Sequence, residues 1–208
     1  MEESIIELIT GDADQSQGML RTQKQEVKLH TVFFDEPIGA PKKYRDLIHQ
    51  LFQADQHDQF IFLMNSPGGY LTTALAIIEA VKASEASVRA VIMGECHSAA
   101  SIIALNCHDI VITDSAHSLV HTAQYGTEGQ TGNVRAHVDF STKHIKGIIE
   151  DTYSGFMTPD EISDLHKGLE FWFDSKQLNK RLNDRMKYLE LKYEKKPKTK
   201  KIAKAVEE

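Results

Sequence analysis

The sequence predicts an α/β fold in which helices cover a mainly parallel β-sheet. Short apolar runs alternate with segments whose apolar residues recur at helical spacing, and this order is typical of parallel sheets. The chain has 208 residues, of which 41% are hydrophobic and 26% are charged. A chain of this length and composition buries one sizeable core without disulfides or metals.

The expected elements follow one another as strand and helix along the middle of the chain. Apolar runs predict the strands, and apolar residues three or four apart predict the helices. The expected strands cover residues 30–34, 60–64, 88–93, 110–113 and 118–120. The expected helices cover residues 41–53, the stretch through Ala74 and Val81, residues 99–105 and residues 133–152. Residues 165–189 are mixed and become helical toward their end.

The domain organisation follows from changes in composition. Residues 1–28 are polar and are interpreted as a flexible N-terminal arm, and residues 29–190 carry all the periodic signal. Residues 191–208 are predicted to be disordered, since seven lysines lie between positions 192 and 204 and few apolar residues could be buried there.

Charge and cysteine content exclude several classes of function. The net charge of −6 argues against a general nucleic-acid binder, which would carry a basic face. No apolar run approaches the ~20 residues that span a bilayer, and the acidic N-terminus does not resemble a secretory signal. Two cysteines make neither a disulfide framework nor a four-ligand zinc site. We therefore expect a cytoplasmic protein without metal or other cofactor, bound to neither membrane nor nucleic acid.

A glycine turn follows the second predicted strand. It reads Asn65-Ser66-Pro67-Gly68-Gly69 and leads into the next predicted helix. Gly68 and Gly69 allow backbone conformations and close approaches that other residues do not. Backbone N–H groups at such a turn could stabilise an oxyanion, although a tight strand-to-helix connection alone would explain the same residues.

A second candidate segment runs from Gly94 through Ser98-Ala99-Ala100-Ser101. Small residues here begin an apolar helix, and Ser101 lies near its N-terminal end, where negative charge is favoured. Ser98 is a rival nucleophile by position, but it suits the start or N-cap of the helix. A packed structural serine is the other interpretation of Ser101.

A third candidate is His121, which ends the predicted strand over residues 118–120. A histidine at a strand end can act as a general base when its other ring nitrogen is oriented. A lone histidine is also commonly structural, so this residue gains meaning only together with the two glycine- and serine-containing segments.

Together these motifs resemble the Clp protease family of caseinolytic serine peptidases. The chain shows NSPGG at 65–69, SAAS at 98–101, SLVH at 118–121, YGTEGQTG at 125–132 and a long helix after it, in the family's order. The resemblance covers roughly residues 30–185. It implies the fold shared by Clp proteases and crotonases, with repeated β-β-α units and a protruding handle helix.

The resemblance also implies residue roles. Ser101 would be the nucleophile and His121 the general base, and the backbone N–H groups of Gly68 and Ile102 would form the oxyanion hole. Glu170 would be the third member of the triad, with Asp174 as the nearby alternative. A glutamate can orient imidazole as aspartate does.

Substrate is expected to lie extended beside a glycine-rich strand over residues 125–132, as an added strand. The residues expected to contact it are Gly69, Tyr125, Gly126 and Thr127. Two departures from the family accompany this assignment. Three extra residues, roughly 95–97, precede Ala-Ala-Ser, and about five residues are missing between Ser101 and His121.

The resemblance further implies partners. Relatives form stacked rings, usually heptameric and hence tetradecameric, with handle helices between the rings. Polypeptide substrates and an ATP-driven AAA+ unfoldase would then be expected partners. This chain has no Walker motif with which to bind nucleotide itself.

Three other functions remain open from the sequence. A crotonase-type acyl-CoA enzyme uses a similar oxyanion turn, and residues 104–113 echo that superfamily. A phage-encoded or signal-peptide-peptidase-like Ser-Lys peptidase would place a lysine near Ser101. An inactive ring subunit would bind polypeptides without cutting them.

Overall fold

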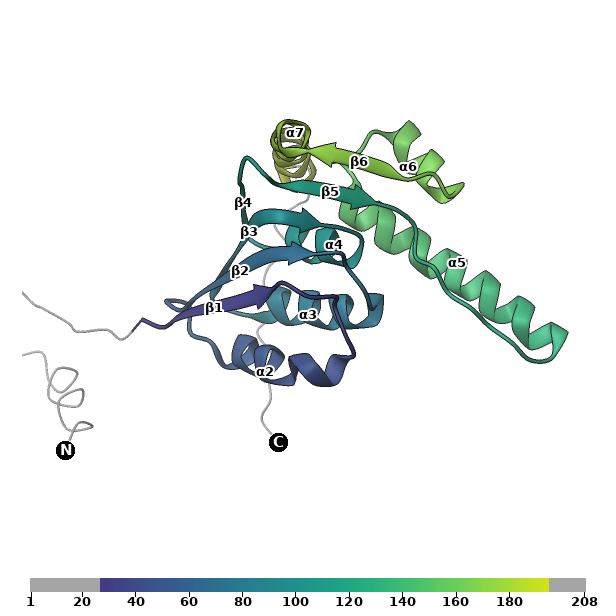
Figure 1. The fold of residues 1–208 in the computed structure, drawn as a ribbon, viewed down its shortest axis with the longest axis horizontal. Coiled ribbons are helices and arrows are strands. Elements are labelled where there is room, and N and C mark those ends of the chain that lie inside the picture. The colour runs from purple at the N-terminus through teal and green to yellow at the C-terminus, as the bar shows by residue number, and fades with distance from the viewer. Residues whose placement is uncertain (1–26, 195–208) are drawn as a thin grey trace, which may run out of the picture.

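The computed structural model describes residues 27–194 and consists of a sheet, helices on one of its faces and a protruding helix (Figure 1). The strands are β1 (Leu29–Phe34), β2 (Gln59–Ser66), β3 (Ser87–Cys96), β4 (Asp109–Ile112), β5 (His117–Val120) and β6 (Phe171–Asp174). The helices are η1 (Pro41–Tyr44), α2 (Arg45–Gln53), α3 (Leu71–Ala83), α4 (Ala99–Leu105), α5 (Thr131–Tyr153), α6 (Pro159–His166) and α7 (Ser175–Glu194).

The sheet is mostly parallel, as the alternation of strands and helices predicts. Strands β1, β2, β3 and β4 pair in parallel in that order, and β3 also pairs with β5 through Glu95 and His117. Among the strands of residues 27–194, only β6 runs antiparallel, beside β5. The mixed α/β class with a mainly parallel sheet is therefore confirmed.

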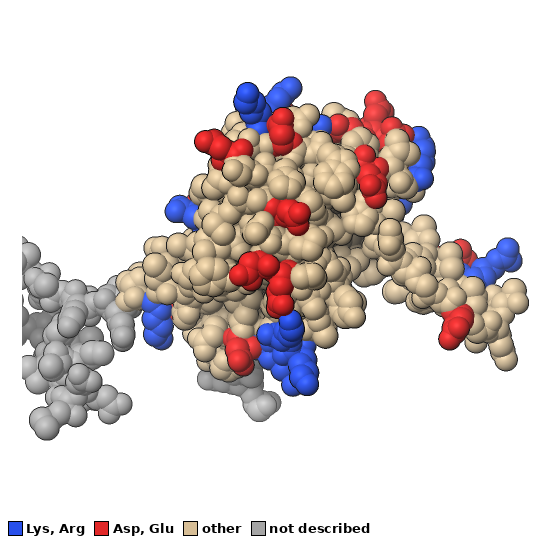
Figure 2. Space-filling model, viewed as in Figure 1, with Lys and Arg blue, Asp and Glu red and all other residues tan. Residues whose placement is uncertain are grey.

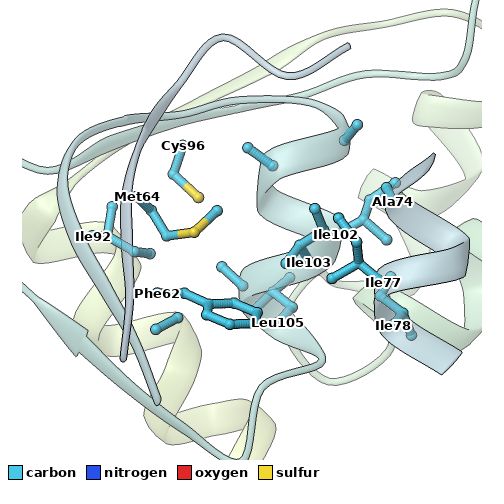
Figure 3. Packing of buried hydrophobic residues seen from close by; sticks show 14 of the residues in the cluster. Phe62, Met64, Ala74, Ile77, Ile78, Ile92, Cys96, Ile102, Ile103 and Leu105 are labelled. Atoms are coloured by element: carbon cyan, nitrogen blue, oxygen red, sulfur yellow. The ribbon is translucent and has the colours of Figure 1, made fainter. Parts of the chain in front are cut away.

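The core lies between the sheet and helices α3 and α4. On β2, Phe60, Phe62 and Met64 alternate with less buried residues and point toward the helices. Figure 3 shows Phe62 and Met64 facing side chains of α4, with α3 packed on the other side of that helix. All seven residues of α4 are buried, so this short helix is fixed on every side.

Within residues 27–194, no helix lies over the opposite face of the sheet, which carries a row of apolar residues. Phe33 pairs with Leu63, Leu63 with Val91 and Val91 with Val111, so that one apolar residue from each of four strands lies in line. Figure 2 views this side, where uncharged residues predominate and a few acidic ones are scattered among them. An uncovered apolar face of this kind is common at interaction surfaces.

Helix α5 projects from the body, and the segment between β5 and α5 runs beside it to its far end (Figure 1). The inner end of α5 is fixed to the body by the buried Arg185 of α7. Its guanidinium donates to the carbonyl oxygen of Thr152 in α5 and, at 3.1 Å, to that of Leu105 in α4. The protruding helix predicted by the family resemblance is thus present and anchored at one end.

Two sequence expectations need correction, and a third is made more precise. Residues 125–130 form no strand, since they pair with no strand within residues 27–194, and α5 already begins at Thr131. The mixed region after residue 165 contains strand β6, whose side chains Phe171 and Phe173 pack toward the core. Helix α7 continues through Glu194, so residues 191–194 of the expected tail are helical. The rest of that tail and residues 1–26 of the expected arm lie outside the described residues.

Within residues 27–194, no helix combines the length and the apolar character that crossing a bilayer requires.

Adjacent phenylalanines on β1 test the assignment of the two sheet faces. Phe34 is 2% exposed and Phe33 is 64% exposed. Replacing Phe34 by Ala should lower the free energy of unfolding by about 3–5 kcal/mol, because it leaves a cavity. Phe33→Ala should lower it by less than about 1 kcal/mol. Urea denaturation of both variants measures the difference, and equal losses would contradict this arrangement.

Candidate active site

A concave site near the predicted motifs lies where the segments that follow β2, β3 and β5 meet α5. It is a cavity of about 600 Å³. The turn at Pro67, Gly69 and Tyr70 forms one wall, and Ser98 and His121 lie on another. Helix α5 closes the third side. The structure therefore brings His121 and the glycine turn together with Ser98.

Ser98 has an unusual backbone conformation. Its φ of 52° and ψ of −122° lie outside the regions that side-chain-bearing residues normally adopt. It is the one non-glycine residue with positive φ among residues 27–194. Strain of this kind costs on the order of 1–3 kcal/mol and concentrates at functional sites, including the nucleophile turns of serine hydrolases.

The backbone around Ser98 is held by hydrogen bonds from two strands. The Ser98 N–H donates to the carbonyl oxygen of Leu119 in β5 at 2.8 Å, and the His97 N–H donates to that of Ser66 in β2 at 3.1 Å. The Ser98 side chain makes no capping bond to α4. The Ser98 hydroxyl therefore does not cap α4, although capping is the structural role that the sequence suggests for this residue.

Ser101 lies elsewhere. It is 4% exposed, on the core side of α4, and its Oγ donates to the carbonyl oxygen of Ser98 at 2.8 Å. The same Oγ lies 2.6 Å from the Tyr153 hydroxyl at the end of α5. Burial raises the pKa of Tyr153 well above its ordinary value. Ser101 does not line the cavity that contains His121, so the structure does not bring these two predicted triad members together.

Both N–H groups predicted to form the oxyanion hole already donate hydrogen bonds within the chain. The Gly68 N–H donates to Ser66 Oγ at 3.2 Å, and the Ile102 N–H donates to the Ser98 carbonyl oxygen at 3.2 Å. By contrast, the structure gives no acceptor within residues 27–194 to the N–H groups of Gly69 and Ala99. The Gly69 amide belongs to the glycine turn, and the Ala99 amide directly follows Ser98.

Close packing keeps that turn against the start of α4. A Cβ on Gly68 would lie 2.5 Å from the His97 carbonyl oxygen and 3.0 Å from the Ala99 nitrogen. Only glycine fits there, and its positive φ of 91° has the same requirement. Gly68 thus brings the Gly69 and Ala99 amides near each other rather than supplying a donor itself.

Glu170 and Asp174 differ in their positions relative to His121. Strands β5 and β6 pair Val120 with Phe171 and His117 with Asp174, so the next antiparallel pair would be His121 and Glu170. Asp174 lies farther along β6, opposite the other end of β5, and its carboxylate accepts a hydrogen bond from the Gln177 N–H at 2.8 Å. Asp174 therefore caps α7, and Glu170 is the acid that the strand register places beside His121.

The expected substrate-contacting residues divide into two groups. Gly69 and Tyr125 line the cavity. The Tyr125 hydroxyl lies 3.3 Å from Thr142 Oγ1 of α5, which fixes the segment after β5 against that helix. Gly126 and Thr127 are exposed, farther along the segment, and do not line the cavity.

His97 precedes Ser98 and packs beside it in an aromatic cluster that residue types alone did not reveal. Its ring centroid lies 5.2 Å from that of His117 and 5.3 Å from the nearest ring of Trp172. Burial lowers the pKa of His97, so its neutral form is favoured. Nearby Cys96 is fully buried, and this burial raises its pKa to about 12, which makes it a poor nucleophile.

A comparison with models of known protein families identifies the family to which this chain belongs. The family model described as Clp protease matches residues 15–176. The chain belongs to the Clp protease family. Membership supports a serine peptidase that acts on polypeptides and favours this function over an acyl-CoA enzyme. The match begins within the segment interpreted from its composition as an arm.

The spacing of the motifs favours Ser98 over Ser101 as the match to the family's serine. Counted from Ser101, the chain has three extra residues after Gly94 and about five too few before His121. Counted from Ser98, three positions earlier, the extra residues disappear and about two are missing. The Ala-Ala-Ser tripeptide by itself favours Ser101, and residue types do not decide between the two serines because both lie among small residues.

The strain at Ser98 predicts an effect on stability. Ser98→Gly should raise the free energy of unfolding by about 1 kcal/mol relative to Ser98→Ala, because glycine adopts this conformation without steric cost. Both substitutions remove the hydroxyl, so the alanine variant is the matched control. Thermal or urea unfolding measures the difference, and a less stable glycine variant would disprove the strain.

Proposed function

We propose that this chain is a serine endopeptidase in which Ser98 is the nucleophile and His121 is the general base. The observation that carries this proposal is the positive φ of Ser98, at the start of α4, in the cavity that His121 also lines. Ser98 lines this cavity and makes no capping bond to α4, as expected of a serine at a nucleophile turn. Family membership supports the reaction class.

In the proposed reaction, His121 takes the proton from Ser98 Oγ as it attacks the scissile carbonyl carbon. The Gly69 and Ala99 N–H groups donate to the resulting oxyanion, and loss of one such donor typically costs about 10²–10³ in rate. His121 then protonates the leaving amine. Water, activated by the same imidazole, hydrolyses the acyl-enzyme.

Glu170 is proposed to orient His121. Its position opposite His121 in the β5–β6 register supports this role. Glu170 is exposed in the isolated chain, and its side chain makes no hydrogen bond to His121 there. A carboxylate that holds imidazole in the right tautomer tightens its contact in the substrate complex.

The Ser-Lys mechanism has less support. Of the described residues that line the cavity, none is lysine, whereas His121 is among them. An inactive ring subunit is distinguished by experiment, since it would bind polypeptides and leave Ser98 unreactive.

Labelling with a fluorophosphonate tests the nucleophile. The wild-type chain should be labelled. Ser98→Ala should lose all labelling, because the substitution removes the hydroxyl that is proposed to attack the reagent. Ser101→Ala is the matched control. It should retain labelling and lose about 1 kcal/mol of stability, since a buried hydrogen bond to Tyr153 is removed. Labelling that survives Ser98→Ala and disappears in Ser101→Ala would restore the assignment made from the sequence.

We further propose that the chain assembles into rings of seven that stack into a tetradecamer around a closed chamber. Rings are typical of the family. The protruding α5 supports the contact between rings, since Phe140 is 68% exposed and lies on its outer half. The apolar row on the sheet supports docking of a polypeptide partner such as an AAA+ unfoldase. A cytoplasmic location is part of the same proposal.

Native mass spectrometry tests the assembly. The mass should be seven or fourteen times 23.4 kDa. Phe140→Glu should convert the double ring to single rings, because it buries charge at the contact between rings. Phe52→Glu, on α2 and 56% exposed, should leave the mass unchanged. A monomeric wild-type chain would contradict the proposal.

A further inference from the structure

The cavity beside Ser98 has an uneven chemical character. Its inner part is apolar, formed by five residues from α3, α4 and α5: Leu71, Ile102, Ile145, Ile148 and Ile149. Its outer part carries His137, Ser141 and His144, all from α5. Positions 137, 141 and 144 recur at helical spacing, so they form one polar stripe that faces the cavity.

The two histidines of this stripe are held in place by neighbours. His137 Nε2 lies 3.4 Å from Ser141 Oγ, and its ring packs edge-on against Tyr125 at 6.1 Å. The ring of His144 stacks on Phe140 at 5.8 Å. Both side chains are exposed, and these contacts favour the observed ring positions over other rotamers, which reduces the entropy lost on binding.

No carboxylate balances these imidazoles within the cavity. Of its lining residues, all of them in the described part of the chain, none is Asp, Glu, Lys or Arg. The other titratable groups that face the stripe are His121 and Tyr125 from the segment after β5 and Tyr70 from the glycine turn. On α5 itself, Asp139 and Lys143 lie beside the stripe but do not line the cavity.

We propose that His137 and His144 make this cavity selective for acidic side chains of the peptide substrate when their rings are protonated. This inference rests on the proposed peptidase function and adds its specificity. Histidine changes charge between about pH 5 and 8. Once charged, the stripe lacks a counter-ion, and a substrate Asp or Glu carboxylate supplies one. A substrate Lys or Arg finds no carboxylate there and is disfavoured by the charged stripe.

The test compares Glu and Gln at matched positions of otherwise identical fluorogenic peptides. The two side chains have the same shape, and both substrates depend equally on His121, so the ratio of their kcat/KM values cancels the titration of the base. At the peptide position whose side chain meets the stripe, the ratio of kcat/KM for the Glu peptide to that for the Gln peptide should rise roughly three- to fivefold from pH 7.5 to pH 5.5.

Variants attribute this change to the stripe. In His137→Asn with His144→Asn the ratio should stay constant with pH, although peptide hydrolysis persists. His49→Gln, an exposed histidine on α2 away from the cavity, should behave like the wild-type chain. A constant ratio at every position in the wild-type chain, or an unchanged rise in the double variant, would overturn the proposal.

A binding measurement separates this inference from the proposed catalysis. The Ser98→Ala variant should bind the Glu peptide more tightly than the Gln peptide at pH 5.5 and equally at pH 7.5, as measured by fluorescence anisotropy. If the wild-type chain hydrolyses nothing but this preference is seen, the specificity stands and the peptidase function fails. If both peptides are hydrolysed and bind equally at both pH values, the peptidase function stands and the specificity fails.

Discussion

The conformation of Ser98 is the constraint on which the proposed active site depends. A residue with a side chain occupies a region of φ and ψ that normally requires glycine. This state persists because the surrounding structure fixes the chain on both sides. The Ser98 N–H is bonded to β5, the preceding His97 N–H is bonded to β2, and the following helix α4 is buried throughout.

The same constraint explains why the site needs Gly68 and Gly69, although these residues are far from Ser98 in the sequence. The turn after β2 must touch the start of α4, and a side chain at Gly68 would collide with the backbone of His97. Contact between the two segments places the turn at Gly68 against the Ala99 nitrogen. The energy that maintains the strained turn comes from the buried core under α4, where Phe62 and Met64 pack against the helix.

The sequence predicted most of the fold and part of the site, for physical reasons. Strands such as β2 and helices such as α3 have strong apolar periodicity, so their positions can be predicted to within a few residues. Strand β6 has only four residues and borders helix α7, so its pattern is hidden in the mixed region. His121 and the glycine turn could be predicted because they occur together with the serine segment in the order typical of the family.

The choice between Ser98 and Ser101 could not be made from residue types alone. Both serines are small, lie three positions apart and precede apolar residues. What distinguishes them is a backbone dihedral angle and the direction of a side chain, and these follow from long-range contacts with β2 and β5. The free amides of Gly69 and Ala99 likewise depend on which neighbours are already bonded. The stripe of His137 and His144 acquires its meaning only when α5 folds back over the cavity.

The most direct measurement is the position of a covalent adduct. The chain would be treated with a fluorophosphonate, digested, and the modified peptide sequenced by tandem mass spectrometry. Our account predicts a single phosphonylated residue, Ser98, in the native protein and none after denaturation. An adduct on Ser101, or modification of neither serine, would contradict it.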